Sequence, residues 1–265
     1  MHILKPGLLV ILFCLTAGLL RAQSPYKLNL GKEIVISGVS LSAGLIGTQL
    51  RANVPIYTAG ELAALDAGPI NALDRGATGN YSLRAHEASN VLWLSAMAAP
   101  VFFLAGKAPR SHFGTVALLW GETLLTASSL TLLTKYAARR TRPFVYNPDV
   151  PIDKKQTANA RGSFFSGHTS LSAAGTFFAA RVFSDYYPDS PWKPVVWGAA
   201  AAIPAATGYF RVKGGRHFPT DVLAGYAVGA LAGIFVPQLH RRARADQRLG
   251  IRAGGNYLAV SWSLR

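Results

Sequence analysis

The chain has 265 residues, of which 50% are hydrophobic and 15% charged, and its formal net charge is +15 at pH 7. Soluble proteins carry charges at about 25% of their positions, so this chain lacks the polar coat of an ordinary cytosolic protein. Either much of it faces lipid, or it is an all-helical domain rich in small residues. The positive charge favours an anionic membrane surface or an anionic small molecule as partner. Nucleic acid is disfavoured because no nucleic-acid-binding motif is present. Basic residues cluster at 135–142 and 211–216, which indicates a local anion site.

Residues 1–22 have the pattern of a secretory signal peptide. Lys5 precedes the apolar run GLLVILFCLTAGLL, and Ala22 offers a cleavage point. The run is shorter than the roughly 20 residues that a membrane span needs, although an uncleaved anchor is the alternative. Cys14 is the only cysteine. Cleavage would leave a chain without thiols, which excludes disulfides, thiolate metal sites and cysteine catalysis.

Residues 23–87 form a mixed region, which we expect to be an exported N-terminal segment. The stretch 33–50 is only moderately apolar and contains several Ser, Gly and Gln residues, so we do not expect it to cross a membrane. A region rich in Pro, Gly and Asp follows it.

Five apolar segments rich in Ala, Leu, Gly and Ser come next, without the period-two pattern of strands. They predict an all-α fold, a bundle of about five to six core helices over residues 88–240, embedded in a membrane. A soluble bundle is the alternative, because Glu122 and Pro204 lie inside these segments. In the C-terminal tail, 241–265, the stretch NYLAVSWSLR alternates like a strand, although a frayed end is the simpler interpretation. The segments are 88–106, 113–134, 168–183, 194–210 and 221–239.

The connections between these segments suggest an orientation. Lys107 and Arg110 lie between the first two segments, and basic connections favour the cytoplasmic side. The charged loops 135–167 and 211–220 then both lie outside. We therefore predict a protein of the bacterial inner membrane with its site facing the periplasm, or alternatively a soluble periplasmic protein.

Three short motifs carry candidate chemistry, in and beside these two loops. Arg and Lys are the usual phosphate-binding side chains, so Lys135, Arg142 and Arg211 are candidates to surround one phosphoryl group. Ser166 and Gly167 stand at a predicted helix start, where free backbone N–H groups favour an anion. The motifs are Lys135 with Arg142-Pro143, Phe165-Ser166-Gly167-His168, and Arg211 with His217 and Asp221.

The two histidines and Asp221 suggest acid–base and nucleophilic roles. His217 and Asp221 are four residues apart, on one face of a helical turn. A carboxylate that accepts from one imidazole nitrogen leaves the other free to attack phosphorus. His168 is then the candidate general acid for the leaving oxygen.

Each motif taken alone has a more ordinary interpretation. The basic run from Lys135 to Arg142 is typical of a solvated or headgroup-binding patch, Ser-Gly-His of a helix cap, and His217 with Asp221 of a surface hydrogen bond or half a metal site. Cations rather than acids surround the histidines, so no metal or other cofactor is expected. The combination in this order favours phosphate chemistry.

Together the motifs resemble those of the type 2 phosphatidic acid phosphatase superfamily, which includes lipid phosphate phosphatases, bacterial acid phosphatases and vanadium haloperoxidases. Its signature is K-x6-R-P, then P-S-G-H, then S-R-x5-H-x3-D, and residues 135–221 follow it. The resemblance implies a helical bundle and metal-independent hydrolysis through a phosphohistidine. It assigns His217 as nucleophile, Asp221 as its orienting partner and His168 as acid. It assigns phosphate binding to Lys135, Arg142, Ser166, Gly167 and Arg211.

Two positions depart from the signature, since Phe165 replaces proline and Phe210 replaces serine. Neither carries charge or transfers a proton, so activity on a phosphorylated lipid is the leading prediction. Lys213 and Arg216 add cations that favour a diphosphate, although a solvated loop explains them equally well. The alternatives are a periplasmic acid phosphatase acting on small phosphate esters, a haloperoxidase, and a non-catalytic lipid-phosphate binder or transporter. No oligomeric state is predicted.

Overall fold

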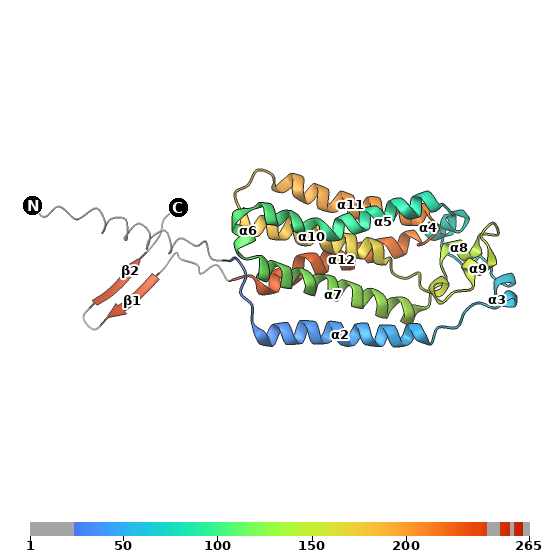
Figure 1. Cartoon of the computed structure of the whole chain (residues 1–265), viewed down its shortest axis with the longest axis horizontal. Coiled ribbons are helices and arrows are strands. Elements are labelled where there is room, and N and C mark those ends of the chain that lie inside the picture. The colour runs from blue at the N-terminus through green and yellow to red at the C-terminus, as the bar shows by residue number, and fades with distance from the viewer. Residues whose placement is uncertain (1–23, 243–249, 255–256, 262–265) are drawn as a thin grey trace, which may run out of the picture.

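Six long helices form the body of the protein. The structure is a computed structural model, and it describes residues 24–242, 250–254 and 257–261. Figure 1 shows these helices side by side along one long axis. The predicted signal peptide, residues 1–22, lies outside the described residues. The helices are α2 (Leu30–Ala52), α5 (Leu83–Ala98), α7 (Phe113–Ala138), α10 (Gly167–Tyr186), α11 (Lys193–Lys213) and α12 (Pro219–His240).

The helices alternate in direction between two ends of the bundle. We call the end that carries the short helices α3, α4, α8 and α9 the loop end, at the right of Figure 1, and the other the α6 end. Helices α2, α7 and α11 run toward the loop end, and α5, α10 and α12 start from it. The shorter elements are α3 (Ala59–Ala63), α4 (Ala72–Arg75), η1 (Gly76–Gly79), η2 (Ala99–Ala105), α6 (Lys107–Ser111), α8 (Pro143–Tyr146), α9 (Ile152–Lys155) and η3 (Ala158–Arg161).

Helix starts and ends have local causes in the sequence. The hydroxyl of Ser82 accepts a hydrogen bond from the N–H of Ala85 and so caps α5. Pro219 occupies the first turn of α12, where no intrahelical N–H partner is needed. Helix α7 ends at Arg139, whose φ of 47° turns the chain out of the helix.

Helix α10 is the central helix of the bundle and packs on α5, α7, α11 and α12. Small residues allow the closest approach. A Cβ at Gly229 of α12 would lie 1.9 Å from the carbonyl oxygen of Ser170, and one at Gly175 would lie 2.4 Å from that of Ala96. Any larger residue at these positions would push the helices apart.

The outer surface of the bundle is apolar. Leu30, Ile34 and Val39 of α2 are each more than 60% exposed, and α12 exposes Leu223 and other large side chains in the same way. Three helical stretches are long and apolar enough to cross a membrane: Leu30–Ala52, Phe113–Tyr146 and Pro219–His240. A surface of this kind belongs to a membrane protein. The prediction of an all-α, membrane-embedded bundle is confirmed.

All five predicted helical segments are present, with the first one ending as the 3₁₀ helix η2. The sixth long helix, α2, lies along α7, so the segment 23–87 contributes to the bundle instead of standing apart from it. Helix α2 also meets the length and hydropathy of a span, which we did not expect of residues 33–50. In the tail, the structure matches the strand and not the frayed end: β1 (Gly250–Gly254) and β2 (Tyr257–Ser261) form an antiparallel pair.

Candidate active site

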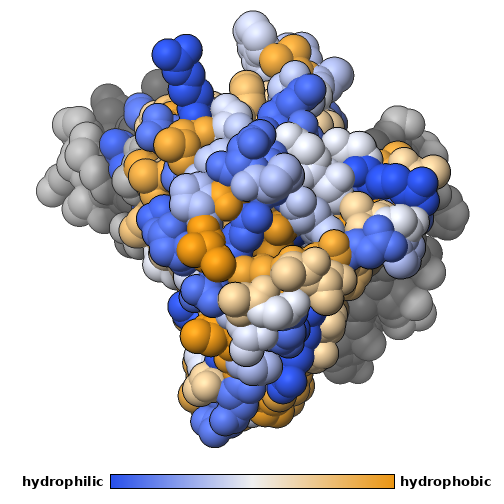
Figure 2. Space-filling view, turned by 90° about the vertical axis from the view of Figure 1, so that its right-hand side faces the viewer, coloured by the Kyte–Doolittle hydropathy of each residue, from blue (hydrophilic) through white to orange (hydrophobic). Residues whose placement is uncertain are grey.

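A cavity of about 320 Å³ opens at the loop end of the bundle. Figure 2 looks onto this end, where hydrophilic residues surround smaller apolar patches. The lining side chains come from α2, α5, α7, α10, α11 and the loops between them. They are Arg51, His86, Lys135, Tyr136, Arg142, Asn159, Gly167, His168, Arg211, Arg216 and His217.

His217 stands immediately before α12 with both ring nitrogens directed at functional groups. Its Nδ1 lies 3.6 Å from a carboxylate oxygen of Asp221, one turn further on. Its Nε2 lies 3.4 Å from Nη1 of Arg142. The side chain is 1% exposed. Asp221 therefore lies beside Nδ1 but beyond hydrogen-bond distance, and Nδ1 has no hydrogen-bond partner among the described residues, while Nε2 lies on the cation side.

Asp221 is held by a network that the motifs did not reveal. Its carboxylate accepts hydrogen bonds from the hydroxyl of Ser163 and the N–H of Phe218, and it pairs with Arg140. Arg140 also pairs with the buried Asp74 of α4 at 2.7 Å. The orientation of Asp221 is thus fixed from three directions.

Asp74 anchors the start of α12 from the neighbouring short helix. It accepts from the N–H and the hydroxyl of Thr220, at 3.0 and 2.6 Å. Burial raises the pKa of Asp74, but hydrogen bonds from Thr220 and Arg140 outweigh this, so the pKa is lowered. The carboxylate is therefore charged when it pairs with Arg140 at neutral pH.

The three predicted phosphate-binding cations all line the cavity and are almost completely buried. Arg142 is oriented by Asn159, whose backbone and side-chain oxygens each accept a hydrogen bond at 2.8 Å. Lys135 donates to the carbonyl of Gly162 at 2.9 Å. Arg211 donates to Nδ1 of His86 at 2.8 Å. Backbone and neutral acceptors hold all three, which leaves their charge uncompensated in the cavity.

His168 lies in the first turn of α10 and lines the same cavity as His217. Its Nε2 is 2.8 Å from Oδ1 of Asn90, and its ring packs on Trp93 with centroids 4.6 Å apart. An amide oxygen only accepts, so this contact assigns a proton to Nε2. The ring is fixed in place by α5.

Of the two predicted phosphate contacts at the start of α10, Gly167 lines the cavity and Ser166 does not. Gly167 lines the cavity, where a Cβ would meet Thr131 at 2.9 Å. The hydroxyl of Ser166 is fully buried and bonds instead to the hydroxyl of Thr169 at 2.9 Å, as the cap of α10. Ser166 is not among the lining residues. The expected contact of its hydroxyl with phosphate is therefore not supported by the structure.

Five further lining residues lie outside the motif positions from which we predicted the site. Arg216 was noted as an extra cation, and it lines the cavity, whereas Lys213 does not. His86, Arg51 and Asn159 carried no local signal, because they come from α5, α2 and η3, far away in the sequence. Only the packing of the bundle brings them to the site.

Burial and the nearby cations Lys135, Arg142 and Arg211 hold the pKa of His217 well below the ordinary histidine value. The imidazole is consequently neutral at neutral pH, and its Nε2 lone pair is available. A tetrahedral phosphoryl group in the cavity would be bound by cations and face this lone pair. The lining residues include no carboxylate, so the cavity suits an anion better than a metal ion.

Comparisons with known proteins agree with this chemistry. The PAP2 superfamily matches residues 116–245. Two relatives from Porphyromonas gingivalis are a lipid A 4'-phosphatase, 30% identical over 58% of this chain and 63% of its own length, and a lipid A 1-phosphatase, 33% identical over 43% and 23%. The chain thus spans less than two thirds of either relative.

A solved structure is also similar. It is a transmembrane PAP2-type phosphatidylglycerolphosphate phosphatase from Bacillus subtilis, which covers 76% of this chain and 94% of its own, with 24% identity and a TM-score of 0.45. The matched region of the chain, residues 116–245, holds His217, Asp221, His168 and the three buried cations. Over this region, which is slightly less than half of the chain, the sequence matches the PAP2 superfamily.

Proposed function

We propose that the chain is a membrane-bound phosphatase that hydrolyses a lipid phosphate or diphosphate, without a metal, through a phosphohistidine at His217. One observation carries the proposal. Nε2 of His217 faces a buried cation cluster, while the carboxylate of Asp221 lies 3.6 Å from Nδ1, close enough to accept its proton after a small movement. A protein that only bound or transported a lipid phosphate would need the cations but not this oriented nucleophile.

The reaction proceeds in two displacements. Nε2 of His217 attacks phosphorus, the bond to the lipid oxygen breaks, and that oxygen takes the Nδ1 proton of His168, which enters the step as an imidazolium and keeps its Nε2 proton on Asn90. A water molecule then attacks the phosphohistidine, gives a proton to His168 and releases inorganic phosphate. Lys135, Arg142 and Arg211 stabilise the charge on the equatorial oxygens in both steps. Asp221 stabilises the imidazolium character that His217 acquires.

The substrate is a lipid whose phosphate enters the cavity while its apolar part remains outside. A volume of about 320 Å³ is at the small end of ligand pockets, so it accommodates a phosphorylated headgroup but not a whole lipid. The relatives act on lipid A phosphates according to their names, and a lipid A phosphate is therefore our first candidate. Phosphatidic acid, phosphatidylglycerol phosphate and undecaprenyl diphosphate are the others. The exposed apolar helices favour such lipids over small soluble esters.

The proposed site faces the periplasm of a bacterial envelope, which has a consequence for the N-terminus. If all six long helices cross the membrane, residue 24 and His240 lie on the same side, opposite the cavity. An exported residue 24 would then place the cavity in the cytoplasm. The short connection at the α6 end carries Lys107 and Arg110, as cytoplasmic connections usually do, whereas many of the loop-end cations belong to the cavity. In this orientation Leu30, at the start of α2, lies on the cytoplasmic side.

Labelling in intact cells tests the orientation. In a Cys14→Ser background, a cysteine at Glu61 of the loop end should react with a membrane-impermeant maleimide, and one at Asp189 of the α6 end should not. Both positions are exposed. The reverse pattern would place the site in the cytoplasm.

Trapping of the intermediate tests the mechanism. The purified full chain, quenched during turnover of a radiolabelled lipid phosphate, should carry an acid-labile, alkali-stable phosphate. We expect His217→Ala to lose the label and to lower kcat by roughly 10⁴–10⁶-fold, as removal of a nucleophile does in other hydrolases. Unchanged phosphate release by this variant, with an unchanged melting temperature, would refute the assignment.

A further inference from the structure

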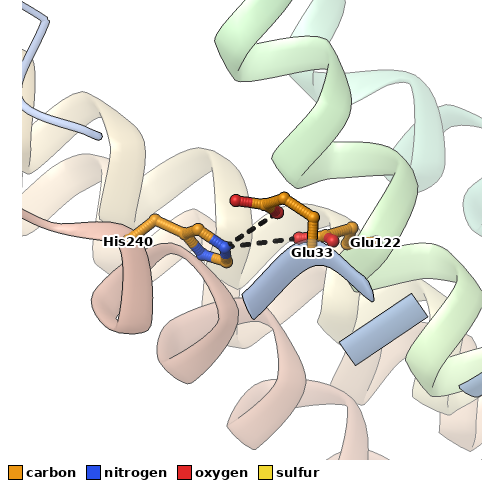
Figure 3. Close-up of side chains that lie close together, drawn as sticks. All are labelled: Glu33, Glu122 and His240. Carbon is orange, nitrogen blue, oxygen red and sulfur yellow. Dashed lines mark hydrogen bonds and ion pairs between the residues drawn. The ribbon is translucent and has the colours of Figure 1, made fainter. Parts of the chain in front are cut away.

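A second buried histidine lies at the α6 end of the bundle, in contact with two carboxylates. Nε2 of His240 is 3.1 Å from Oε2 of Glu33 and 3.6 Å from Oε2 of Glu122. Figure 3 shows the three side chains pointing toward one another from α12, α2 and α7. His240 and Glu122 are almost fully buried. The cluster plays no part in the proposed reaction.

We propose that Glu33, Glu122 and His240 bind a divalent transition-metal ion that fastens α2 to the rest of the bundle. The hydrogen bonds of His240 show which ring nitrogen carries its proton. Its Nδ1 is 2.8 Å from the carbonyl oxygen of Val236, which can only accept, so Nδ1 carries the proton. The lone pair of a neutral ring then points from Nε2 at two carboxylates. A cation between them removes this repulsion.

Glu122 contributes a carboxylate oxygen without a partner. Oε2 of Glu122 is buried and has no hydrogen-bond partner. A buried carboxylate oxygen without a partner is strongly unfavourable. Protonation of His240 would satisfy Glu33, at 3.1 Å, better than Glu122, at 3.6 Å. A metal ion would coordinate both oxygens and the imidazole at once.

The geometry suits a tetrahedral ion. The three candidate ligand atoms lie within 4.8 Å of one another. Metal–ligand bonds of about 2.0–2.1 Å imply ligand separations of about 3.3 Å in a tetrahedral zinc site. The two distances from Nε2 of His240, 3.1 and 3.6 Å, bracket this value. Two carboxylates would also balance the charge of a divalent ion.

Each ligand is held by a further hydrogen bond, as the ligands of metal sites usually are. Glu33 accepts through its other oxygen from the N–H of Asn29 at 2.9 Å. Glu122 accepts through its other oxygen from the hydroxyl of Ser37 at 3.1 Å. Nδ1 of His240 donates to the carbonyl of Val236. The candidate ligands are therefore already oriented.

The site would join an outer helix to the bundle. Near the cluster, Nζ of Lys32 donates to the carbonyl of Leu239, which is the only other side-chain hydrogen bond between α2 and α12 among the described residues. Helix α2 delivers Arg51 to the cavity at its opposite end. A metal ion that fixes the start of α2 would thus stabilise the helix that supplies this cation.

Zinc is the probe of choice, because imidazole with carboxylates suits it and it binds more tightly than manganese or ferrous iron. The tag-free full chain, purified in detergent, stripped with a chelator and incubated with ZnCl₂, should retain about one zinc per chain, as a single site with three protein ligands requires. Zinc should also raise its melting temperature, because a ligand of the native state stabilises it.

The variants Glu122→Gln and His240→Gln should weaken zinc binding at least about tenfold, the smallest loss that even an outer partner of a metal site causes. Glu33→Gln removes one candidate ligand with the least disturbance to folding, because Glu33 is only half-buried and Gln retains the acceptor for the N–H of Asn29. Glu61→Gln, a carboxylate at the loop end that pairs with Arg161, is the matched control and should keep its zinc.

His217→Ala excludes zinc held by the cavity histidines and should also keep the metal. No retained zinc in the wild-type chain would overturn the proposal. So would equal zinc retention in all three ligand variants, or zinc that is lost in His217→Ala. A cluster that is only an ion pair would leave the melting temperature insensitive to zinc.

Discussion

The two ends of the bundle each bury a histidine, and they surround it with opposite charge. At the loop end, His217 faces Lys135, Arg142 and Arg211, which lower its pKa and make an anion site. At the α6 end, His240 faces Glu33 and Glu122, which make a cation site. The same imidazole is the proposed nucleophile in one setting and a candidate metal ligand in the other. The neighbours, and not the ring, assign the chemistry.

The loop end differs from the α6 end in a second way, because it adds another histidine as a proton donor. His168→Ala should lower kcat about 10³-fold on a lipid phosphate, whose alkoxide leaves poorly without a proton. On an aryl phosphate with a nitrophenol leaving group, the loss should be below about tenfold, because that group needs no acid.

Steady-state kinetics on both substrates measure this difference. His112→Gln, at the α6 end, is the control and should behave like the wild type on both. Equal losses on the two substrates would show that His168 only shapes the cavity.

Replacing the guanidinium group of Arg142 tests whether the cation cluster, rather than His217 alone, makes the loop end a phosphate site. Arg142→Lys keeps the positive charge, but an ammonium group cannot donate to both oxygens of Asn159, which orient the planar guanidinium group of Arg142. We expect kcat/KM to fall about 100-fold, the effect of losing one oriented donor. Lys213→Ala, a cation outside the cavity lining, should stay within about twofold. Comparable losses in both variants would point to long-range electrostatics.

The low pKa of His217 has a pH signature. The neutral ring is the nucleophile, so activity is lost as pH falls through the pKa of the folded protein. Because that pKa is depressed, the acid limb of kcat/KM should lie below the ordinary histidine value of about 6.5.

Lys135→Met, which removes one of the cations that lower this pKa, should move the limb to higher pH. Ionisation of the substrate phosphate would give a limb that does not move with the variant. A limb that is the same in both proteins would therefore remove His217 as its origin.

The contrast between the two ends also explains what the sequence could predict. The five apolar segments and the three motifs were readable because their residues are close together or regularly spaced. Helix α2 was not, because its polar residues face inward: Ser37 bonds to Glu122 and Ser40 to Thr126, while Ile34 and Val39 face outward. Averaged along the chain, such a helix looks only moderately apolar. Its role depends on which face each residue occupies.

The site was predictable in its charged residues and less so in its supports. Arg140 and Asp74 hold Asp221 across elements far apart in sequence, and no spacing rule connects them. His86 likewise reaches Arg211 only because α5 packs beside α11. Motif spacing identified most of the charged groups that line the cavity, whereas the tertiary packing determines the groups that orient them.

Ser166 is the position where motif and structure disagree, and it provides the smallest and most discriminating test. A hydroxyl that bound phosphate would cost about 100-fold in kcat when removed. A hydroxyl that caps α10 would cost about 1 kcal/mol of stability and leave kcat almost unchanged. The buried bond between Ser166 and Thr169 predicts the second result for Ser166→Ala.

Thr169→Val removes the partner of that bond, so a double-mutant cycle with Ser166→Ala should show coupling in the melting data, because the two side chains act together. Additive effects on stability combined with a large loss of kcat would instead return the Ser166 hydroxyl to the phosphate. The loop end would then bind its anion with a neutral donor as well as with cations.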